Sequence, residues 1–196
     1  MFIFHKHKVI YIIVPGTGSN SFHGGYREKY SPGAHWEQLK ITKKTKADPI
    51  YAVNPDIGMY QHWTAEQVKM FIDSNKWNSY RKIGFVRDPY EWTCSLYKKG
   101  AGVKHAVGID NDGTYMEYIE KLEKTPYFWF TNSSGDVIID TIYRTEDLQK
   151  ICLEFDIPYL HKNKTSLKSK RKCPEKNEEI EKILREKFYR EYEHYE

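Results

Sequence analysis

Hydrophobic residues in this chain occur in short runs, and longer amphipathic segments separate them. Residues 9–14 form one apolar run, and residues 83–86 form a second that ends directly before Arg87. Both runs have the length of a buried strand. Residues 137–143 alternate and include β-branched residues after a Ser-Ser-Gly-Asp turn, as is typical of a third strand. The pattern predicts strands at residues 8–14, 81–86 and 137–143, with a further short candidate at residues 49–53.

Helices are expected in the segments between and after these strands. Thr64 can cap a helix over residues 64–73, and an acidic residue follows in its first turn. Pro89 suits the first turn of a helix that runs to about residue 99. The charged segment 175–192 carries apolar residues on one face, which is typical of a helix that packs on a core. Further helices are predicted at residues 19–30, 115–124 and 145–155, and loops at residues 31–48, 100–112 and 161–172.

The alternation of strands and helices predicts the arrangement of the sheet. Parallel strands joined by helices form an α/β domain, so we expect a three-layer α/β/α fold with a central, mainly parallel sheet. No internal repeat or linker divides the sequence, which indicates a single domain over residues 1–196. Ligands of such sheets bind outside the carboxyl ends of the strands. The loops after residues 14 and 86 lie at that edge, so residues 16–21 and Arg87 can converge on one ligand.

Composition and charge narrow the class of protein. Hydrophobic residues make up 39% of the chain and charged residues 30%, as in a globular domain. The net charge of +4 suits an anionic ligand and is too small to indicate nucleic acid as a partner. The sequence has neither a stretch as apolar as a membrane span nor the pattern of a signal peptide. We therefore expect a cytoplasmic protein with no membrane partner.

The three cysteines give no sign of a cross-link. The chain has an odd number of widely spaced cysteines and no CxxC motif; they are Cys94, Cys152 and Cys173. This pattern indicates neither a disulfide framework nor a zinc site. We expect reduced thiols, as in a reducing compartment, and no bound metal.

The loop that follows the first strand is rich in glycine and hydroxyl groups. Its sequence, Pro-Gly-Thr-Gly-Ser-Asn-Ser at residues 15–21, leads directly into a predicted helix. Backbone N–H groups without a helical partner and the helix dipole both attract anions at such a helix start. The loop lacks the GxxxxGK[ST] pattern of nucleotide hydrolases and the GxGxxG pattern of dinucleotide-binding proteins. An anion site and an ordinary strand-to-helix turn are equally open at this point.

A second motif follows the strand at residues 81–86. Arg87 ends this strand, and Ser95 lies eight residues later on the predicted helix, which brings it back near the strand edge. An arginine with a hydroxyl group suits a phosphate monoester, because both can donate hydrogen bonds to its oxygens. The competing interpretation, which this motif alone favours, is that Arg87 forms a structural ion pair and that Ser95 is a surface hydroxyl.

In combination, the two motifs resemble those of the sulfotransferases that use 3′-phosphoadenosine-5′-phosphosulfate (PAPS), in particular carbohydrate sulfotransferases of the membrane-family type. That family has Pro-Lys-Thr-Gly-Gly/Ser-Thr-Ser after its first strand and Val-Arg-Asn/Asp-Pro-Tyr-x-Arg-x-x-Ser-x-Tyr after a central strand. Here PGTGSNS and VRDPYEWTCSLY occupy these places in the same order. Further similarity lies in HWTA at residues 62–65, YRTEDL at 143–148 and HKNKT at 161–165, so it spans most of the chain.

The resemblance implies a P-loop-NTPase-like sulfotransferase fold. It also implies transfer of the sulfuryl group from PAPS to a hydroxyl of a carbohydrate or other small-molecule acceptor, with 3′-phosphoadenosine-5′-phosphate (PAP) as the product. Arg87 and Ser95 are assigned to the 3′-phosphate. His62 matches a histidine base of related enzymes, which suits deprotonation of a hydroxyl. Without the resemblance, a capping or otherwise satisfied histidine is the slightly favoured interpretation. The residues that would hold the 5′-phosphosulfate are Gly16, Thr17, Gly18, Ser19, Asn20 and Ser21.

The chain departs from the family pattern at the loop. Gly16 stands where the family has lysine, Asn20 replaces the second threonine, and Trp92 replaces the arginine after Pro-Tyr-x. A cation beside the leaving phosphate stabilises the transition state by on the order of a few kcal/mol, and glycine cannot supply it. The candidate replacements are Lys6, Lys8 and Lys164.

Two alternative functions stay open. A degenerate family member would bind PAPS or PAP without efficient transfer, because the loop lysine is missing. An atypical small nucleotide-binding kinase is the other alternative. The missing lysine and the lack of an evident Mg²⁺-binding carboxylate disfavour the kinase.

Overall fold

The computed structural model describes residues 1–30, 35–38, 62–100, 107–109, 113–160 and 171–196. Within these residues the chain forms an α/β fold around a five-stranded mixed sheet with the order β3-β1-β2-β4-β5. β2 pairs in parallel with β4 and β4 with β5, whereas β1 runs antiparallel to both β2 and β3. The strands are β1 (Phe2–Phe4), β2 (Val9–Tyr11), β3 (Trp36–Gln38), β4 (Arg81–Val86) and β5 (Thr141–Arg144).

The amino-terminal hairpin is the main departure from the predicted sheet. The turn at residues 5–8 reverses the chain from β1 into β2, and β1 in turn pairs with β3. The sheet is therefore mixed, and the prediction of a mainly parallel sheet is wrong for this half. β1 and β3 have only three residues each, which is too few to show a hydrophobic period. The predicted strand at residues 49–53 lies outside the described residues.

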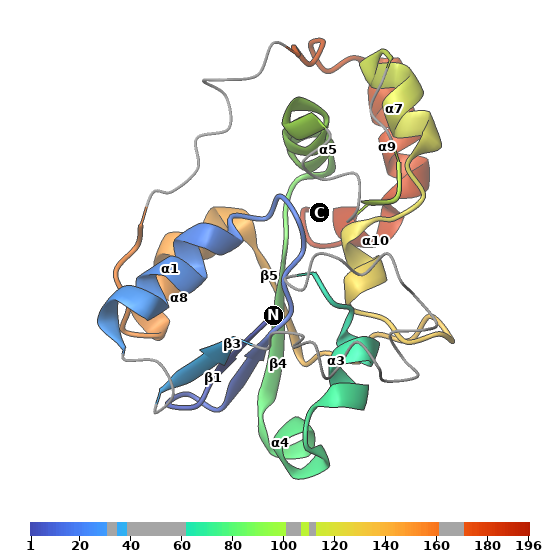
Figure 1. Ribbon diagram of the computed structural model, residues 1–196. Helices are drawn as coiled ribbons and strands as arrows, with labels where there is room; N and C mark the ends of the chain where they lie inside the picture. The colour runs from blue at the N-terminus through green and yellow to red at the C-terminus, as the bar shows by residue number, and fades with distance from the viewer. Residues whose placement is uncertain (31–34, 39–61, 101–106, 110–112, 161–170) are drawn as a thin grey trace.

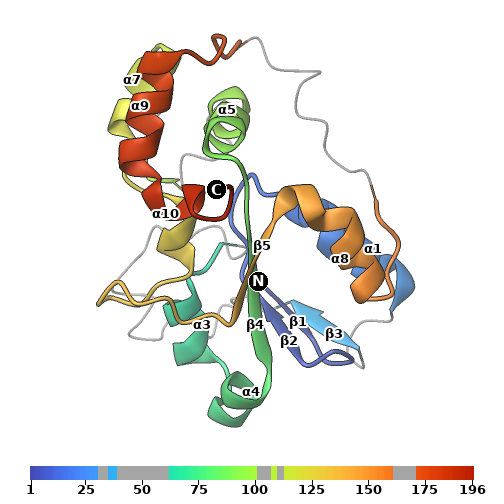
Figure 2. The same ribbon diagram turned by 180° about the vertical axis from the view of Figure 1, so that it is seen from behind.

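Helices lie on both sides of the sheet (Figure 1). α1 (Ser19–Lys29) and α8 (Leu148–Glu154) lie side by side on one side, and α3 (Ala65–Phe71) lies on the other, as the reverse view in Figure 2 also shows. Within the described residues no helix is both long and apolar enough to cross a membrane. The further helices and 3₁₀ turns are α4 (Ser74–Ser79), α5 (Pro89–Lys99), α7 (Tyr115–Lys121), η3 (Pro126–Trp129), η4 (Thr145–Asp147), α9 (Glu178–Lys187) and α10 (Tyr189–Tyr192).

Burial on both faces explains the continuous apolar run of the first predicted strand. Successive side chains of a strand point to opposite faces of the sheet. Phe4 and Tyr11 belong to the core cluster that includes residues of α1 and α8, and Ile3 and Ile10 belong to the cluster that includes residues of α3 and α5. All four side chains are fully buried. Because both faces are covered, the strands need apolar residues at every position rather than at alternate ones.

The local signals for helix starts are confirmed. The Thr64 hydroxyl accepts the N–H of Gln67, and the Gln67 side chain accepts the N–H of Thr64, which forms a capping box before α3. Asp88 caps α5, which begins at Pro89 as predicted. The predicted helix at residues 175–192 is instead divided into α9 and α10 at Phe188, whose ring is fully buried. The helix α4 was not predicted.

A disulfide joins α5 to the segment that precedes α9. Cys94 and Cys173 are bonded across 79 residues of sequence, with their Cα atoms 5.8 Å apart, so the prediction of reduced thiols is wrong for this pair. Cys152 is a free, buried thiol. The Tyr90 hydroxyl donates to the Pro174 carbonyl, so this segment lies along α5. A cross-link over such a long loop stabilises a fold by about 2–4 kcal/mol, chiefly by restricting the unfolded chain.

Candidate functional site

The loop between β2 and α1 has the backbone of an anion site. Gly16 and Gly18 have φ values of 85° and 68°, in the left-handed region that glycine adopts without strain. No side chain caps α1, and its first turn holds no acidic residue. The N–H of Ser21 donates a hydrogen bond to the Gly18 carbonyl. The helix dipole and the N–H groups at this end thus favour a negatively charged ligand.

The loop is held against α5 by direct contacts. The indole Nε1 of Trp92 donates a hydrogen bond of 2.6 Å to the Pro15 carbonyl. A Cβ atom at Gly16 would lie 3.2 Å from Leu96 Cδ2 and 3.3 Å from the Trp92 ring. Trp92 is therefore a buried support of the loop. The sequence motif indicated only that Trp92 cannot make the contact expected of an arginine.

A third segment joins the loop to the end of β4. Thr145 Oγ1 lies 2.8 Å from the Val86 carbonyl and 3.4 Å from the Thr17 carbonyl, so one hydroxyl connects both backbones. A Cβ atom at Gly18 would lie 3.2 Å from Thr145 Cγ2. The carboxyl ends of β2, β4 and β5 therefore meet here, and Arg87 follows Val86 directly. The sequence prediction that the two motifs converge on one edge of the sheet agrees with this arrangement.

Several predicted ligand side chains are engaged within the protein. Thr17 is fully buried, and its hydroxyl donates to the Val14 carbonyl over 3.0 Å. Asn20 Oδ1 lies 2.9 Å from His23 Nε2, and the His23 ring stacks on Phe2 with 4.4 Å between centroids. These contacts order the loop and the first turn of α1. A bound anion would accordingly be held chiefly by backbone N–H groups.

A buried hydroxyl lies beneath the loop. Tyr11 is fully buried, and its hydroxyl lies beside those of Thr17 and Ser19 without a well-formed hydrogen bond to any described residue. Burial raises the pKa of Tyr11 above its usual range, so the phenol stays protonated and remains a donor. Ser21, in the first turn of the helix, is also buried. The floor of the loop is thus polar and uncharged.

Arg87 and Ser95 both lie on or next to α5. The Arg87 Nη2 atom is 2.9 Å from Glu91 Oε2, and 30% of the Arg87 side chain is exposed. This is the ion pair that the competing interpretation expected. Such a partly exposed pair contributes only about 0.5 kcal/mol, so a phosphate could compete for the guanidinium. Ser95 is buried one turn after Trp92.

His62 lies at the same edge of the sheet. Its Nδ1 is 3.0 Å from the Ile13 carbonyl, which requires the proton on Nδ1 and leaves Nε2 as the basic nitrogen. The Trp129 indole donates to the His62 carbonyl and fixes the backbone. Burial lowers the pKa of His62 to about 4, against the opposing effect of the Ile13 bond, and the positive charges of the Met1 amine and Lys99 add to the decrease. The imidazole is therefore neutral near pH 7.

Two of the candidate replacement lysines lie at the wrong edge. Lys6 Nζ donates to the Tyr30 hydroxyl over 2.8 Å, in the turn that precedes β2. The Lys8 carbonyl accepts the N–H of Arg81, where β4 begins. Both lysines are thus at the amino ends of β2 and β4, opposite the loop. Lys164 lies outside the described residues.

Sequence reasoning missed a basic residue that does lie at this edge. Lys99 is half-buried at the end of α5, close enough to Arg87 and His62 for their charges to interact. The sequence carried a signal for it, because Lys99 is seven residues after Trp92 and therefore on the same face of the helix.

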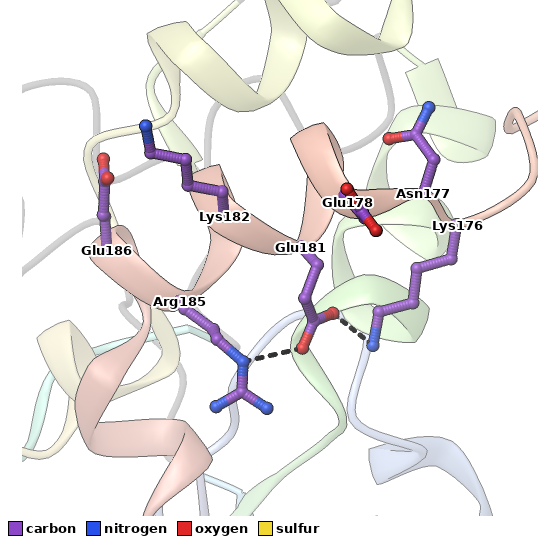
Figure 3. A pocket seen from close by; sticks show the side chains of 7 residues that line it. All are labelled: Lys176, Asn177, Glu178, Glu181, Lys182, Arg185 and Glu186. Atoms are coloured by element: carbon purple, nitrogen blue, oxygen red, sulfur yellow. Dashed lines mark ion pairs between the residues drawn. The ribbon is translucent and has the colours of Figure 1, made fainter.

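A separate hollow of about 680 Å³ runs along α9 (Figure 3). Glu181 forms ion pairs with both Lys176 and Arg185 in its wall. Acidic and basic side chains balance there, and none of the predicted site residues takes part. The lining residues are Lys176, Asn177, Glu178, Glu181, Lys182, Arg185 and Glu186.

Comparison with models of known families, with curated protein sequences and with solved structures gives no match. The function of the site therefore has to be argued from its own chemistry.

The packing of the loop on α5 predicts a difference between two glycines. Gly16 and Gly135 have nearly equal φ values of 85° and 84°, but only at Gly16 would an added Cβ atom have neighbours within 4 Å. Alanine at either position costs about 1 kcal/mol for the left-handed backbone. Gly16→Ala should lower the free energy of unfolding by a further 1–2 kcal/mol, roughly, because the new methyl group crowds Trp92 and Leu96. Urea unfolding of both variants measures this difference, and equal losses would contradict the packing.

The environment of His62 predicts a pH dependence. Its pKa of about 4 in the folded protein is below the unfolded value of 6.5. The unfolded chain therefore binds more protons between these values, and folding stability contributed by the neutral imidazole is lost as the pH falls from 6.5 towards 4. His62→Gln keeps a donor for Ile13 but does not titrate, so its stability should decline less over this window. NMR titration should find the wild-type imidazole neutral at pH 6, and a midpoint near 6.5 would refute the buried, neutral state.

Proposed function

We propose that the protein is a PAPS-dependent sulfotransferase with a three-layer, P-loop-like fold, which transfers a sulfuryl group to a hydroxyl of a carbohydrate or other small acceptor. One observation carries the proposal. The uncapped start of α1, the end of β4 with Arg87, and the neutral His62 all lie at the carboxyl edge of one sheet. The site thus combines hydrogen-bond donors for two anionic groups with a base that is uncharged near pH 7.

The residues fit the two anionic groups of the donor. A 5′-phosphosulfate suits the loop, because Gly16 and Gly18 let its backbone approach closely and no acidic residue opposes the charge. A 3′-phosphate suits Arg87 and the Ser95 hydroxyl. The guanidinium would exchange a weak ion pair with Glu91 for bidentate hydrogen bonds to phosphate.

The reaction requires a base on the acceptor side. The acceptor oxygen forms a bond to sulfur, the bond between sulfur and the phosphate oxygen breaks, and the acceptor proton must be removed. His62 is suited to accept this proton on Nε2, because its Nδ1 proton is held by the Ile13 carbonyl. Burial keeps it neutral before the reaction, and with a pKa of about 4 it is a weaker base than a free imidazole. PAP would leave with the bridging oxygen and its negative charge.

Binding of nucleotide without transfer is the second candidate. It is favoured by Gly16, which has no side chain to stabilise the leaving phosphate, and by Thr17, whose hydroxyl donates to Val14. Tight PAP binding together with no PAPS turnover on any hydroxyl acceptor would select it.

Nucleotide binding is the direct test. Calorimetry should give tighter binding of PAP than of ADP or ATP, because only PAP has the 3′-phosphate that Arg87 would recognise. Arg87→Ala should weaken PAP binding by about tenfold or more, as expected for loss of a charge-assisted hydrogen bond. Arg81→Ala is the matched control, because Arg81 lies at the other end of β4 and bonds to Thr141 and Tyr143.

The outcomes separate the candidates. Unchanged PAP affinity in Arg81→Ala with loss in Arg87→Ala supports the proposal. Folded wild-type protein that does not bind PAP, or that binds it no better than ADP, contradicts it. ATP binding that depends on Mg²⁺ would favour a kinase instead.

A further inference from the structure

The proposed function leaves one charge unassigned. In sulfuryl transfer the electron pair of the breaking bond stays on the 5′-phosphate, and a nearby cation stabilises that charge. Gly16 stands where a lysine would supply it. The structure gives a reason for the glycine: a Cβ atom there would lie 3.2 Å from Leu96 and 3.3 Å from Trp92. The tight packing on α5 and the left-handed backbone of Gly16 both disfavour a side chain at this position, so another element is the better source of the cation.

Helix geometry identifies an alternative source on α5 itself. At 100° per residue, Lys99 lies within about 20° of Trp92 around the helix axis and about 60° from Leu96. Trp92 and Leu96 are the residues that contact the loop. Lys99 therefore extends from the loop-facing side of α5, one turn beyond Leu96, and its long side chain is half-buried.

The charges around Lys99 are unusual for a lysine that serves only stability. Burial lowers its pKa, and the neighbouring charge that lowers it further is Arg87, a second cation. Lys99 also lies close enough to His62 to lower the pKa of that imidazole. In the described part of the chain no carboxylate forms an ion pair with the Lys99 ammonium. A half-buried cation beside another cation costs stability, which marks the place as suited to an anionic ligand.

We propose that Lys99 supplies the cation that the loop lacks at Gly16, and that it binds the 5′-phosphosulfate from the side of α5. This inference rests on the proposed function and adds a residue to its site. During transfer the acceptor oxygen bonds to sulfur, the acceptor proton passes to His62, and the bridging oxygen keeps the electron pair of the broken bond. The Lys99 ammonium stays protonated and faces the negative charge that grows on that oxygen.

Three ligands distinguish the two ends of the nucleotide. PAP carries both phosphates, adenosine 5′-monophosphate carries only the end assigned to Lys99, and adenosine 3′-monophosphate carries only the end assigned to Arg87. Lys99→Met should weaken the binding of PAP and of the 5′-monophosphate by about tenfold or more. Its affinity for the 3′-monophosphate should stay within about twofold of the wild type. Arg87→Ala should instead weaken the binding of PAP and of the 3′-monophosphate and leave the affinity for the 5′-monophosphate nearly unchanged. Calorimetry measures PAP, and displacement of PAP measures the two monophosphates.

Control variants separate binding from structure. Lys98→Met removes the adjacent charge from a direction about 120° away from Trp92 and should leave all three affinities unchanged. Lys99→Arg should restore most of the PAP affinity. Without ligand, the melting temperature of Lys99→Met should be equal to or above that of the wild type, because the substitution removes a buried, repelled charge.

Each result bears on a defined claim. If the wild type binds PAP and Lys99→Met binds it equally well, Lys99 is not the missing cation, while the proposed function stands. If the folded wild type does not bind PAP, both fail. A uniform loss of all three ligands with a lowered melting temperature would assign Lys99 a structural role and overturn the inference.

Discussion

The hydrogen bond from the Trp92 indole to the Pro15 carbonyl determines where the loop after β2 lies. It is 2.6 Å long and buried, and the indole face packs against Gly16 at the same place. A buried polar contact of this kind is costly to leave unpaired, so it fixes the relative position of the two segments. Because α5 also carries Ser95 and Lys99 and begins just after Arg87, the same contact helps to set the position of Arg87 and Lys99 relative to the loop. Thr145 adds a second link, through the carbonyls of Val86 and Thr17.

Local sequence signals predicted the parts of this arrangement that depend on neighbours in the chain. The start of α1 at Ser19, the run from β4 into α5 at Pro89 and the cap at Thr64 all follow from glycine, proline and hydroxyl chemistry at fixed positions. That the loop after β2 and Arg87 lie at the same edge of the sheet followed from the order of strands and helices.

Contacts between distant segments could not be predicted in this way. The Cys94–Cys173 disulfide joins residues 79 positions apart, and no motif marks them as a pair. β2 lies within a predicted strand, but its hairpin partner β1 has only three residues, which is too short for a hydrophobic period. Trp92 was interpreted as a lost arginine, although its indole holds the loop. From the sequence, the candidate cations near the loop are Lys6, Lys8 and Lys164. The helix face shared by Trp92 and Lys99 becomes relevant only once α5 is known to contact Gly16.

The electrostatics of the edge follow from this packing. Arg87 and Lys99 repel one another, His62 is kept neutral by burial, and the start of α1 adds its dipole without an acidic cap. The repulsion between Arg87 and Lys99 and the uncapped start of α1 both favour a negatively charged ligand, in line with the proposed nucleotide. The hollow along α9 lacks this imbalance, because acidic and basic residues line it in equal number and Glu181 forms ion pairs with Lys176 and Arg185.

The most direct test of this account is to map PAP binding on the backbone amides by NMR. The account predicts saturable shifts in the amides of Gly16, Gly18 and Ser19 and in those around Arg87, with no comparable change in the turn at residues 5–8 at the opposite edge of the sheet. Shifts confined to the amino-terminal turn or to α9, or no saturable shifts in folded protein, would contradict it.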